Sequence, residues 1–253
     1  MWADRIRAMT GAHWLALFGL IVLSWGALYA MSVPPELRLL EQVYGRDFWV
    51  ALCTITPDAA GYLRMVLMWS LMSAAMMAPT VLPALATYDD LSHVSDRANF
   101  GALVGGYLGV WFGFSALAAG LQMALFQAGL IGAFGDSLSV WLSVALLALA
   151  GLYQFSPLKE ACLSKCRQPM TFFMQHFDEG PWRNGVRLGL VCLGCCWALM
   201  LLAFVGGVMS LAFMGLATAI MVLEKLPDLG RYITKPLGVI LLLSAAGTLV
   251  SAI

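Results

Sequence analysis

Apolar residues run along this chain in long stretches, separated by short segments that hold most of the charges. The stretches lack the alternation of apolar and polar residues that strands of a membrane barrel show. Runs near or above about 18 apolar residues suit helices that cross a bilayer and satisfy their own backbone groups. We therefore predict an all-α, polytopic transmembrane helix bundle that forms a single domain over residues 1–253. Its seven predicted spans lie near residues 13–31, 62–86, 100–121, 138–155, 186–205, 207–225 and 237–253.

Two local signals shape these spans. The segment Val186–Leu223 holds no charge beyond Arg187 at its start, and as one helix it would be about 57 Å long, nearly twice the hydrocarbon core of a bilayer. It must therefore turn back, and Gly206-Gly207 is the predicted hinge. In the second span, Pro79 should free the carbonyl of Ala75 from its helical hydrogen bond and kink the helix.

Composition agrees with a membrane protein. Hydrophobic residues make up 61% of the chain and charged residues 11%, whereas soluble domains carry about a quarter charged residues. The mean hydropathy is +0.85. The 14 Lys and Arg residues balance 14 Asp and Glu residues without a basic block, so we expect the lipid bilayer and not nucleic acid as a partner.

Basic residues in the loops predict the orientation, because cytoplasmic loops keep more Lys and Arg. With the N-terminus in the cytoplasm, only Arg38, Arg46 and Arg64 of all the basic residues fall on outer segments. The first span is expected to remain as an anchor, since Leu28 stands where a cleavage site would need a small residue. Glu224 and Lys225 end the sixth span, and we expect them to snorkel or pair near the surface.

The six cysteines are unevenly placed. Cys53 stands alone in an outer loop, and the other five form two groups, Cys162/Cys166 and Cys192/Cys195/Cys196. Both groups fall on or near the predicted cytoplasmic side, where thiols are normally kept reduced. Metal or redox chemistry is therefore a better explanation for them than a disulfide framework.

The first group lies in a predicted short helix that Ser156 caps and Pro169 ends. Cys162 and Cys166 are four residues apart and share a helical face. Three basic side chains surround them and would favour the thiolate form: Lys159, Lys165 and Arg167. The alternative is a solvated amphipathic segment whose basic residues bind lipid head groups.

The second group opens the fifth span. Cys192 and Cys196 are four residues apart, Met200 extends the same face one turn deeper, and Cys195 flanks it. Soft sulfur atoms thus line the helix for about 12 Å. Because free cysteine also packs as a small apolar residue, packing is the alternative explanation.

Methionines form a third sulfur feature, on one face of the second predicted span: Met65, Met68, Met72 and Met76. Met77 lies off that face. Methionine is common filler in apolar helices, so the stripe alone more often indicates packing. Its depth matches that of the Cys192 group, so we include Met72, Met76, Met77 and Met200 with the five clustered cysteines as candidate metal ligands.

Together these motifs resemble a bacterial family of integral membrane proteins described as predicted metal-binding. The resemblance covers roughly Tyr62 to Lys225, and its motifs are Met68-Trp69…Met72…Ala75-Met76-Met77-Ala78-Pro79, Tyr153-Gln154…Pro157…Lys159…Cys162…Cys166-Arg167…Pro169 and Gly189…Cys192-Leu193-Gly194-Cys195-Cys196-Trp197. It implies a multi-pass protein of the bacterial inner (cytoplasmic) membrane with sulfur-based metal sites.

Thiolate and thioether ligands without imidazole favour Cu(I), although cysteine also suits zinc or an iron–sulfur cluster. The histidines, His13, His93 and His176, show no paired ligand spacing. A zinc site could draw on Cys162, Cys166, Cys192 and Cys195. Our leading hypothesis is a protein that binds or passes Cu(I), together with a metal-delivery partner.

Two further hypotheses come from other functional classes. The Cys192-x-x-Cys195 pair could exchange disulfides with Cys162/Cys166 as a thiol or electron relay. A glycine run at Gly101, Gly105, Gly106, Gly109 and Gly113 would suit a structural subunit of a larger membrane complex or a homo-oligomer. No hydrolytic constellation or phosphate-binding loop is present, so the sequence favours no enzymatic reaction.

Overall fold

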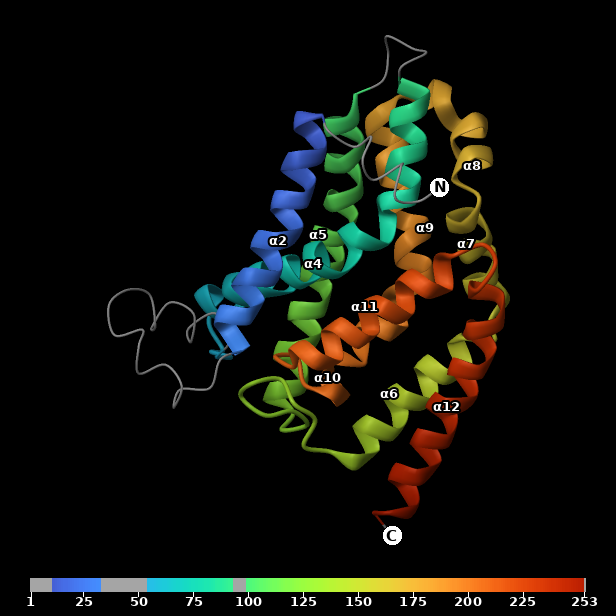
Figure 1. Cartoon of the computed structure of the whole chain (residues 1–253). Helices are drawn as coiled ribbons and strands as arrows, with labels where there is room; N and C mark the ends of the chain where they lie inside the picture. Colours follow the sequence, from blue (N-terminus) through green and yellow to red (C-terminus); the bar gives the residue numbers. More distant parts are fainter. Residues whose placement is uncertain (1–10, 33–53, 93–98, 253) are drawn as a thin grey trace.

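The computed structural model describes residues 11–32, 54–92 and 99–252. The described chain is helical, with one isolated antiparallel bridge between Ile131 and Ser137. Its long apolar helices confirm the predicted all-α membrane architecture (Figure 1). Five of them have the length and hydropathy to cross a bilayer: α2 (Ala12–Ser32), α4 (Ala59–Ser92), α5 (Phe100–Gln127), α9 (Pro181–Leu201) with its continuation α10 (Ala203–Gly206), and α12 (Gly230–Val250).

The remaining helices are shorter. Helices α6 (Val140–Tyr153) and α7 (Pro157–Arg167) meet at a 61° bend and would together make a sixth crossing. Helix α11 (Leu211–Lys225) has 15 residues, fewer than the roughly 20 that a full crossing needs. By length and hydropathy alone, five helices of the described chain could cross a bilayer, or six if α6 and α7 form one bent span, compared with about seven predicted.

Helix ends meet on two sides of the bundle. On one side, His13 Nε2 of α2 lies 3.3 Å from Asp89 Oδ1 at the end of α4, and the Trp14 ring packs at a tilt against the Phe100 ring at the start of α5. On the other side, the Ser137 amide donates to the Phe204 carbonyl at 2.9 Å. This alternation agrees with the helix directions of the predicted topology.

The chain turns after α10, where the sequence predicts a hinge. Gly207 has a φ of +89°, a left-handed conformation that glycine adopts without a steric penalty. Ser210 then caps α11 by accepting a hydrogen bond from the Phe213 amide. The two glycine-linked halves of this apolar segment are therefore separate helices.

Helix α4 continues through Pro79 and Pro83 and changes direction along its length (Figure 1). The Ala75 carbonyl, which Pro79 deprives of its helical donor, accepts a hydrogen bond from Trp25 Nε1 at 2.9 Å. A side chain of α2 thus satisfies the backbone group that the proline leaves free, and it fixes α2 against α4.

Glycines allow α5 and α9 to approach closely. A Cβ built on Gly185 would lie 2.0 Å from the Leu103 carbonyl oxygen, and one built on Gly106 would lie 2.4 Å from the backbone of α9. The predicted glycine stripe of α5 serves this contact only in part, because nothing lies within 4 Å of a Cβ built on Gly109 or Gly113. This tight packing places the cysteines of α9 beside α5.

Helix α7 forms as the sequence predicts. Ser156 Oγ accepts a hydrogen bond from the Lys159 amide at 3.1 Å, and the helix ends at Arg167, just before Pro169. Helix α8 (Pro169–His176) and the 3₁₀ turn η2 (Phe177–Glu179) then connect α7 to α9. Cys162 and Cys166 therefore sit on a short helix that packs against α9.

Candidate metal centre

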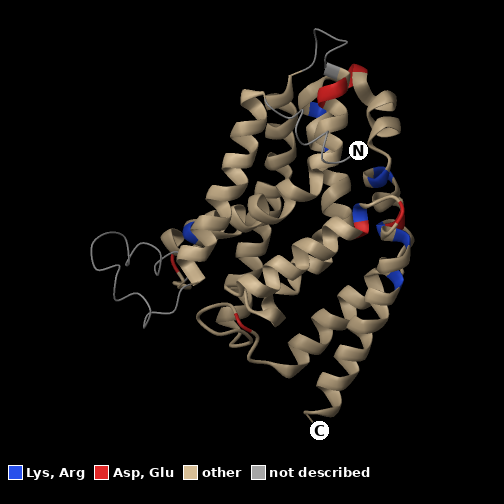
Figure 2. Ribbon diagram, in the orientation of Figure 1, with Lys and Arg blue, Asp and Glu red and all other residues tan. Residues whose placement is uncertain are grey.

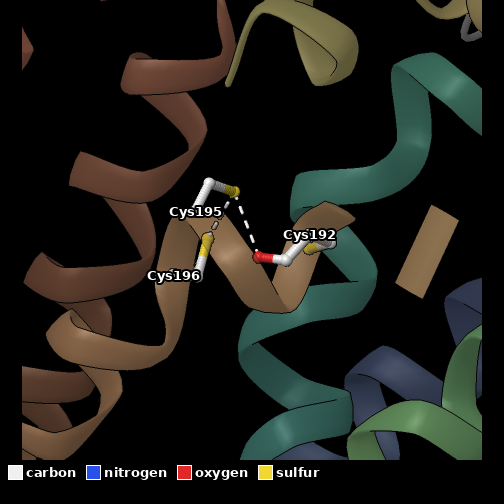
Figure 3. Close-up of side chains that lie close together, drawn as sticks. All are labelled: Cys192, Cys195 and Cys196. Carbon is white, nitrogen blue, oxygen red and sulfur yellow. Dashed lines mark hydrogen bonds between the residues drawn. The ribbon is translucent and has the colours of Figure 1, made fainter. Parts of the chain in front are cut away.

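Three cysteines of α9 gather within one turn and a half of helix. The Sγ atoms of Cys192, Cys195 and Cys196 all lie within 4.8 Å of one another, and each residue is 1% exposed (Figure 3). Cys195 Sγ lies 3.2 Å from Cys196 Sγ and donates to the Cys192 carbonyl at 3.1 Å. All three are free thiols. The cluster follows from helical spacing, which brings residues three and four apart together.

Four helices converge on Cys192. Lys225 Nζ, at the end of α11, lies 3.0 Å from Cys192 Sγ and donates to Thr80 Oγ1 of α4 at 2.6 Å. The Tyr107 hydroxyl of α5 lies 3.1 Å from Cys192 Sγ and donates to the Met77 carbonyl of α4 at 3.1 Å. A cationic and a hydroxyl group thus contact the same buried sulfur.

Of the two alternatives expected for Glu224 and Lys225, snorkelling to the surface is wrong, because both side chains are buried, whereas Glu224 does form an ion pair. Lys159 Nζ of α7 lies 2.9 Å from Glu224 Oε2, and each of these side chains is 1% exposed. Helix α11 ends inside the bundle, where α7 and α9 supply partners for both charges. Opposite charges next to each other at the end of an apolar helix are the one sequence signal for this arrangement.

The basic residues of α7 also differ from the prediction that they surround its cysteines. Lys159 Nζ donates to the Glu224 carboxylate, and Arg167 Nε donates to the Glu224 main-chain carbonyl at 2.9 Å. Arg167 also pairs with Glu160, at 3.2 Å. Lys165 alone of the three remains exposed as an electrostatic neighbour of Cys162.

The two cysteine groups nevertheless meet. A Cβ built on Gly194 would lie 2.6 Å from Cys162 Sγ, so the missing side chain lets this thiol approach α9. One turn further along α7, Cys166 is an electrostatic neighbour of Cys195. Both α7 cysteines are half-buried. Thiols from α7 and α9 therefore lie on the two sides of one helix contact.

The predicted methionine ligands all lie in the core: Met72, Met76, Met77 and Met200. The hydrogen bonds that connect this set with the cysteines in the described chain involve the Met77 carbonyl and no methionine sulfur. The Tyr107 hydroxyl contacts both that carbonyl and Cys192 Sγ. Burial of the methionines therefore fits packing as well as metal binding. His93 and Cys53 fall outside the described residues.

Sequence reasoning missed Tyr107, Thr80 and Lys225. Tyr107 stands within the glycine run of α5, and Thr80 stands between the two prolines of α4, so neither belongs to a recognisable ligand motif. Their convergence depends on how the helices pack, which a single sequence does not encode as spacing.

The chemistry of the donor set fits a soft metal ion, since the clustered donors are thiols without imidazole. A family model described as PpoB2, copper chaperone, matches residues 66–248, a segment that contains both groups of clustered cysteines. No curated protein and no solved structure matches the chain. The family match covers well over half of the 253 residues. The chain therefore belongs to the PpoB2 copper chaperone family.

Proposed function

We propose that this protein takes up Cu(I) as cargo on Cys192, Cys195 and Cys196 and hands it on within the membrane. The observation that carries the proposal is a buried cluster of three free thiols in a member of a copper chaperone family. Thiolate ligands select Cu(I), whereas carboxylate and carbonyl oxygens suit harder ions. We place the protein in a bacterial inner membrane with a cytoplasmic N-terminus, as the loop charges and the motif resemblance imply.

The spacing of the three sulfurs supports this assignment. Three sulfurs at about 2.3 Å from one central ion, the distance in zinc thiolates, lie about 4 Å apart. The three Sγ atoms lie within 4.8 Å of one another on a single continuous helix. Small side-chain rotations therefore suffice to surround one ion, and the helix backbone stays in place.

Lys225 would offset part of the negative charge of copper thiolates at this site. Three thiolates around Cu(I) carry a net charge of minus two, and an uncompensated charge in a buried site is costly. The Lys225 ammonium, 3.0 Å from Cys192 Sγ, halves that charge. The Tyr107 hydroxyl carries one proton, which it donates to the Met77 carbonyl and would turn toward Cys192 Sγ if that sulfur becomes a thiolate.

The α7 thiols supply an exit for the ion. Cys166 is an electrostatic neighbour of Cys195, and Cys162 Sγ lies against Gly194, so both α7 thiols lie next to the helix that carries the cluster. Exchange of one sulfur ligand at a time can move Cu(I) from α9 to α7. The half-buried α7 cysteines then present it to a metal-delivery partner.

Metal analysis of the protein purified without chelators tests the proposal. We expect about one copper per chain, with sulfur as the nearest neighbour in the copper X-ray absorption spectrum. One zinc held by four sulfurs, or iron in place of copper, would contradict it. Protein without metal whose Cys166 and Cys195 pair reversibly under controlled redox conditions would instead favour the thiol relay.

The Lys225→Met variant is expected to bind Cu(I) at least about 100-fold more weakly, because the copper thiolates lose the buried charge that opposes theirs. Competition with a chromophoric Cu(I) chelator measures the affinity. Lys165→Met is the matched control, since Lys165 is an exposed lysine on α7. Equal affinities of the Lys225→Met variant and the unchanged protein would remove Lys225 from the site.

A further inference from the structure

A second polar site lies on the side of α7 that faces α12. A cavity of about 620 Å³ opens between the turn that joins α6 to α7 and the first turns of α12. Charged residues gather along the ribbon on this flank of the bundle (Figure 2). The residues that line the cavity include no cysteine; its polar members are Gln154, Ser156, Glu160, Arg231, Thr234 and Lys235.

The side-chain amide of Gln154, which lines this cavity, is buried without a hydrogen-bond partner in the described part of the chain. The residue is 4% exposed, and neither Nε2 nor Oε1 of its amide has a hydrogen-bond partner among the described residues. A buried polar atom without a partner costs free energy, so native structures usually satisfy such groups. The natural complement of this amide is a ligand that accepts a hydrogen bond from Nε2 and donates one to Oε1.

The charges around the cavity favour an anion. Arg231 and Lys235 are four residues apart on α12, so they share a helical face, and both are exposed. Within the part of the chain that the structure describes, neither forms a salt bridge. The cavity also contains the N-terminus of α7 at Ser156, whose helix dipole attracts negative charge. The one acidic residue of the lining, Glu160, already pairs with Arg167 at 3.2 Å.

We propose that this cavity binds a phosphate group that carries or adjoins a hydroxyl. Arg231 would hold two phosphate oxygens and Lys235 would add a point charge, the two modes in which these residues recognise phosphate. The Gln154 amide nitrogen would donate to a third oxygen, and its carbonyl would accept from the hydroxyl. A glycerophospholipid head group and free hydrogen phosphate share this chemistry, and both fit a cavity of this size.

Native mass spectrometry of the full-length protein in detergent tests the site with three probes: phosphatidylglycerol, phosphatidylcholine with the same acyl chains, and inorganic phosphate. We expect the protein to retain phosphatidylglycerol or phosphate. The double variant Arg231→Gln/Lys235→Gln should bind at least about tenfold more weakly, because two charge-assisted contacts are lost. The double variant Lys165→Gln/Arg183→Gln, which removes two exposed basic residues elsewhere, should bind like the unchanged protein.

The three probes distinguish a lipid head group from free phosphate as the source of the bound phosphate group. Retention of phosphatidylglycerol that inorganic phosphate does not displace indicates a lipid site, and binding of phosphate alone indicates a site for the free ion. Equal binding by the unchanged protein and the Arg231→Gln/Lys235→Gln variant would overturn the proposal, as would equal retention of both lipids without any binding of phosphate.

The Gln154→Leu variant gives an independent measurement. Since the Gln154 amide has no hydrogen-bond partner within the ranges that the structure describes, its replacement should leave thermal stability without ligand unchanged or raised, and should weaken binding. A lower melting temperature together with unchanged ligand binding would show that Gln154 serves the fold alone, and would contradict its assigned role.

Discussion

A triple variant that carries Cys192→Ser, Cys195→Ser and Cys196→Ser should lose its tightly bound Cu(I), falling from about one copper per chain to background. Serine keeps the size of each side chain but replaces soft sulfur with a hard oxygen, which is a poor ligand for Cu(I). All three sulfurs are buried and lie within 4.8 Å of one another, so the variant removes the whole cluster. Copper analysis after equilibration with a competing chelator measures the loss.

Two other cysteine variants test whether the loss of copper is specific to the α9 cluster. Cys53→Ser changes a cysteine that is remote in sequence from both thiol groups, and it should retain full copper binding. Cys162→Ser/Cys166→Ser should keep copper on α9 but transfer it more slowly to an added chelator, because the α7 thiols are the proposed exit. If the triple variant held as much copper as the unchanged protein, with a helical circular-dichroism spectrum, the assigned ligands would be wrong.

Replacing Lys159 with methionine should destabilise the protein by about 3–5 kcal/mol, which is the usual consequence of removing one partner of a buried ion pair. Glu224 is 1% exposed, and in the described part of the chain its Oε1 atom has no hydrogen-bond partner even with Lys159 in place. Without the ammonium, the carboxylate would remain buried and uncompensated. Unfolding in mixed micelles, followed by circular dichroism, measures the free energy of unfolding.

The double variant Lys159→Met/Glu224→Leu provides the matched comparison. An apolar pair of similar volume can replace a buried ion pair at little cost, so the second change should restore most of the stability that the first removes. A Lys159→Met variant as stable as the unchanged protein would mean that the ion pair contributes nothing to the fold.

Much of this fold can be predicted from the sequence, because the relevant signals are local. Helix-length apolar runs predict the spanning helices, and Ser156 with Pro169 predicts the bounds of α7. The uncharged segment that is too long for one crossing predicts the turn at Gly207. These features depend on residues close to one another in the chain, which is the information that a single sequence carries.

The surroundings of Cys192 could not be predicted in this way. Lys225 reaches Cys192 because α11 ends inside the bundle, and Tyr107 reaches it because glycines let α5 and α9 pack closely. Both contacts join positions far apart in sequence, 33 and 85 residues from Cys192. The cysteine spacing identifies three of the thiols, while packing alone decides which charge and which hydroxyl accompany them.

The last two residues of α11 contact different helices: Glu224 contacts α7, and Lys225 contacts α4 and α9. Glu224 holds α7 through Lys159, and Lys225 holds Cys192 and Thr80. Because the two residues are adjacent, a displacement of α7 that moves Glu224 would also move Lys225, whose ammonium lies beside the thiols. On the proposed copper function, a partner that displaces α7 would therefore also disturb the ammonium beside the copper ligands.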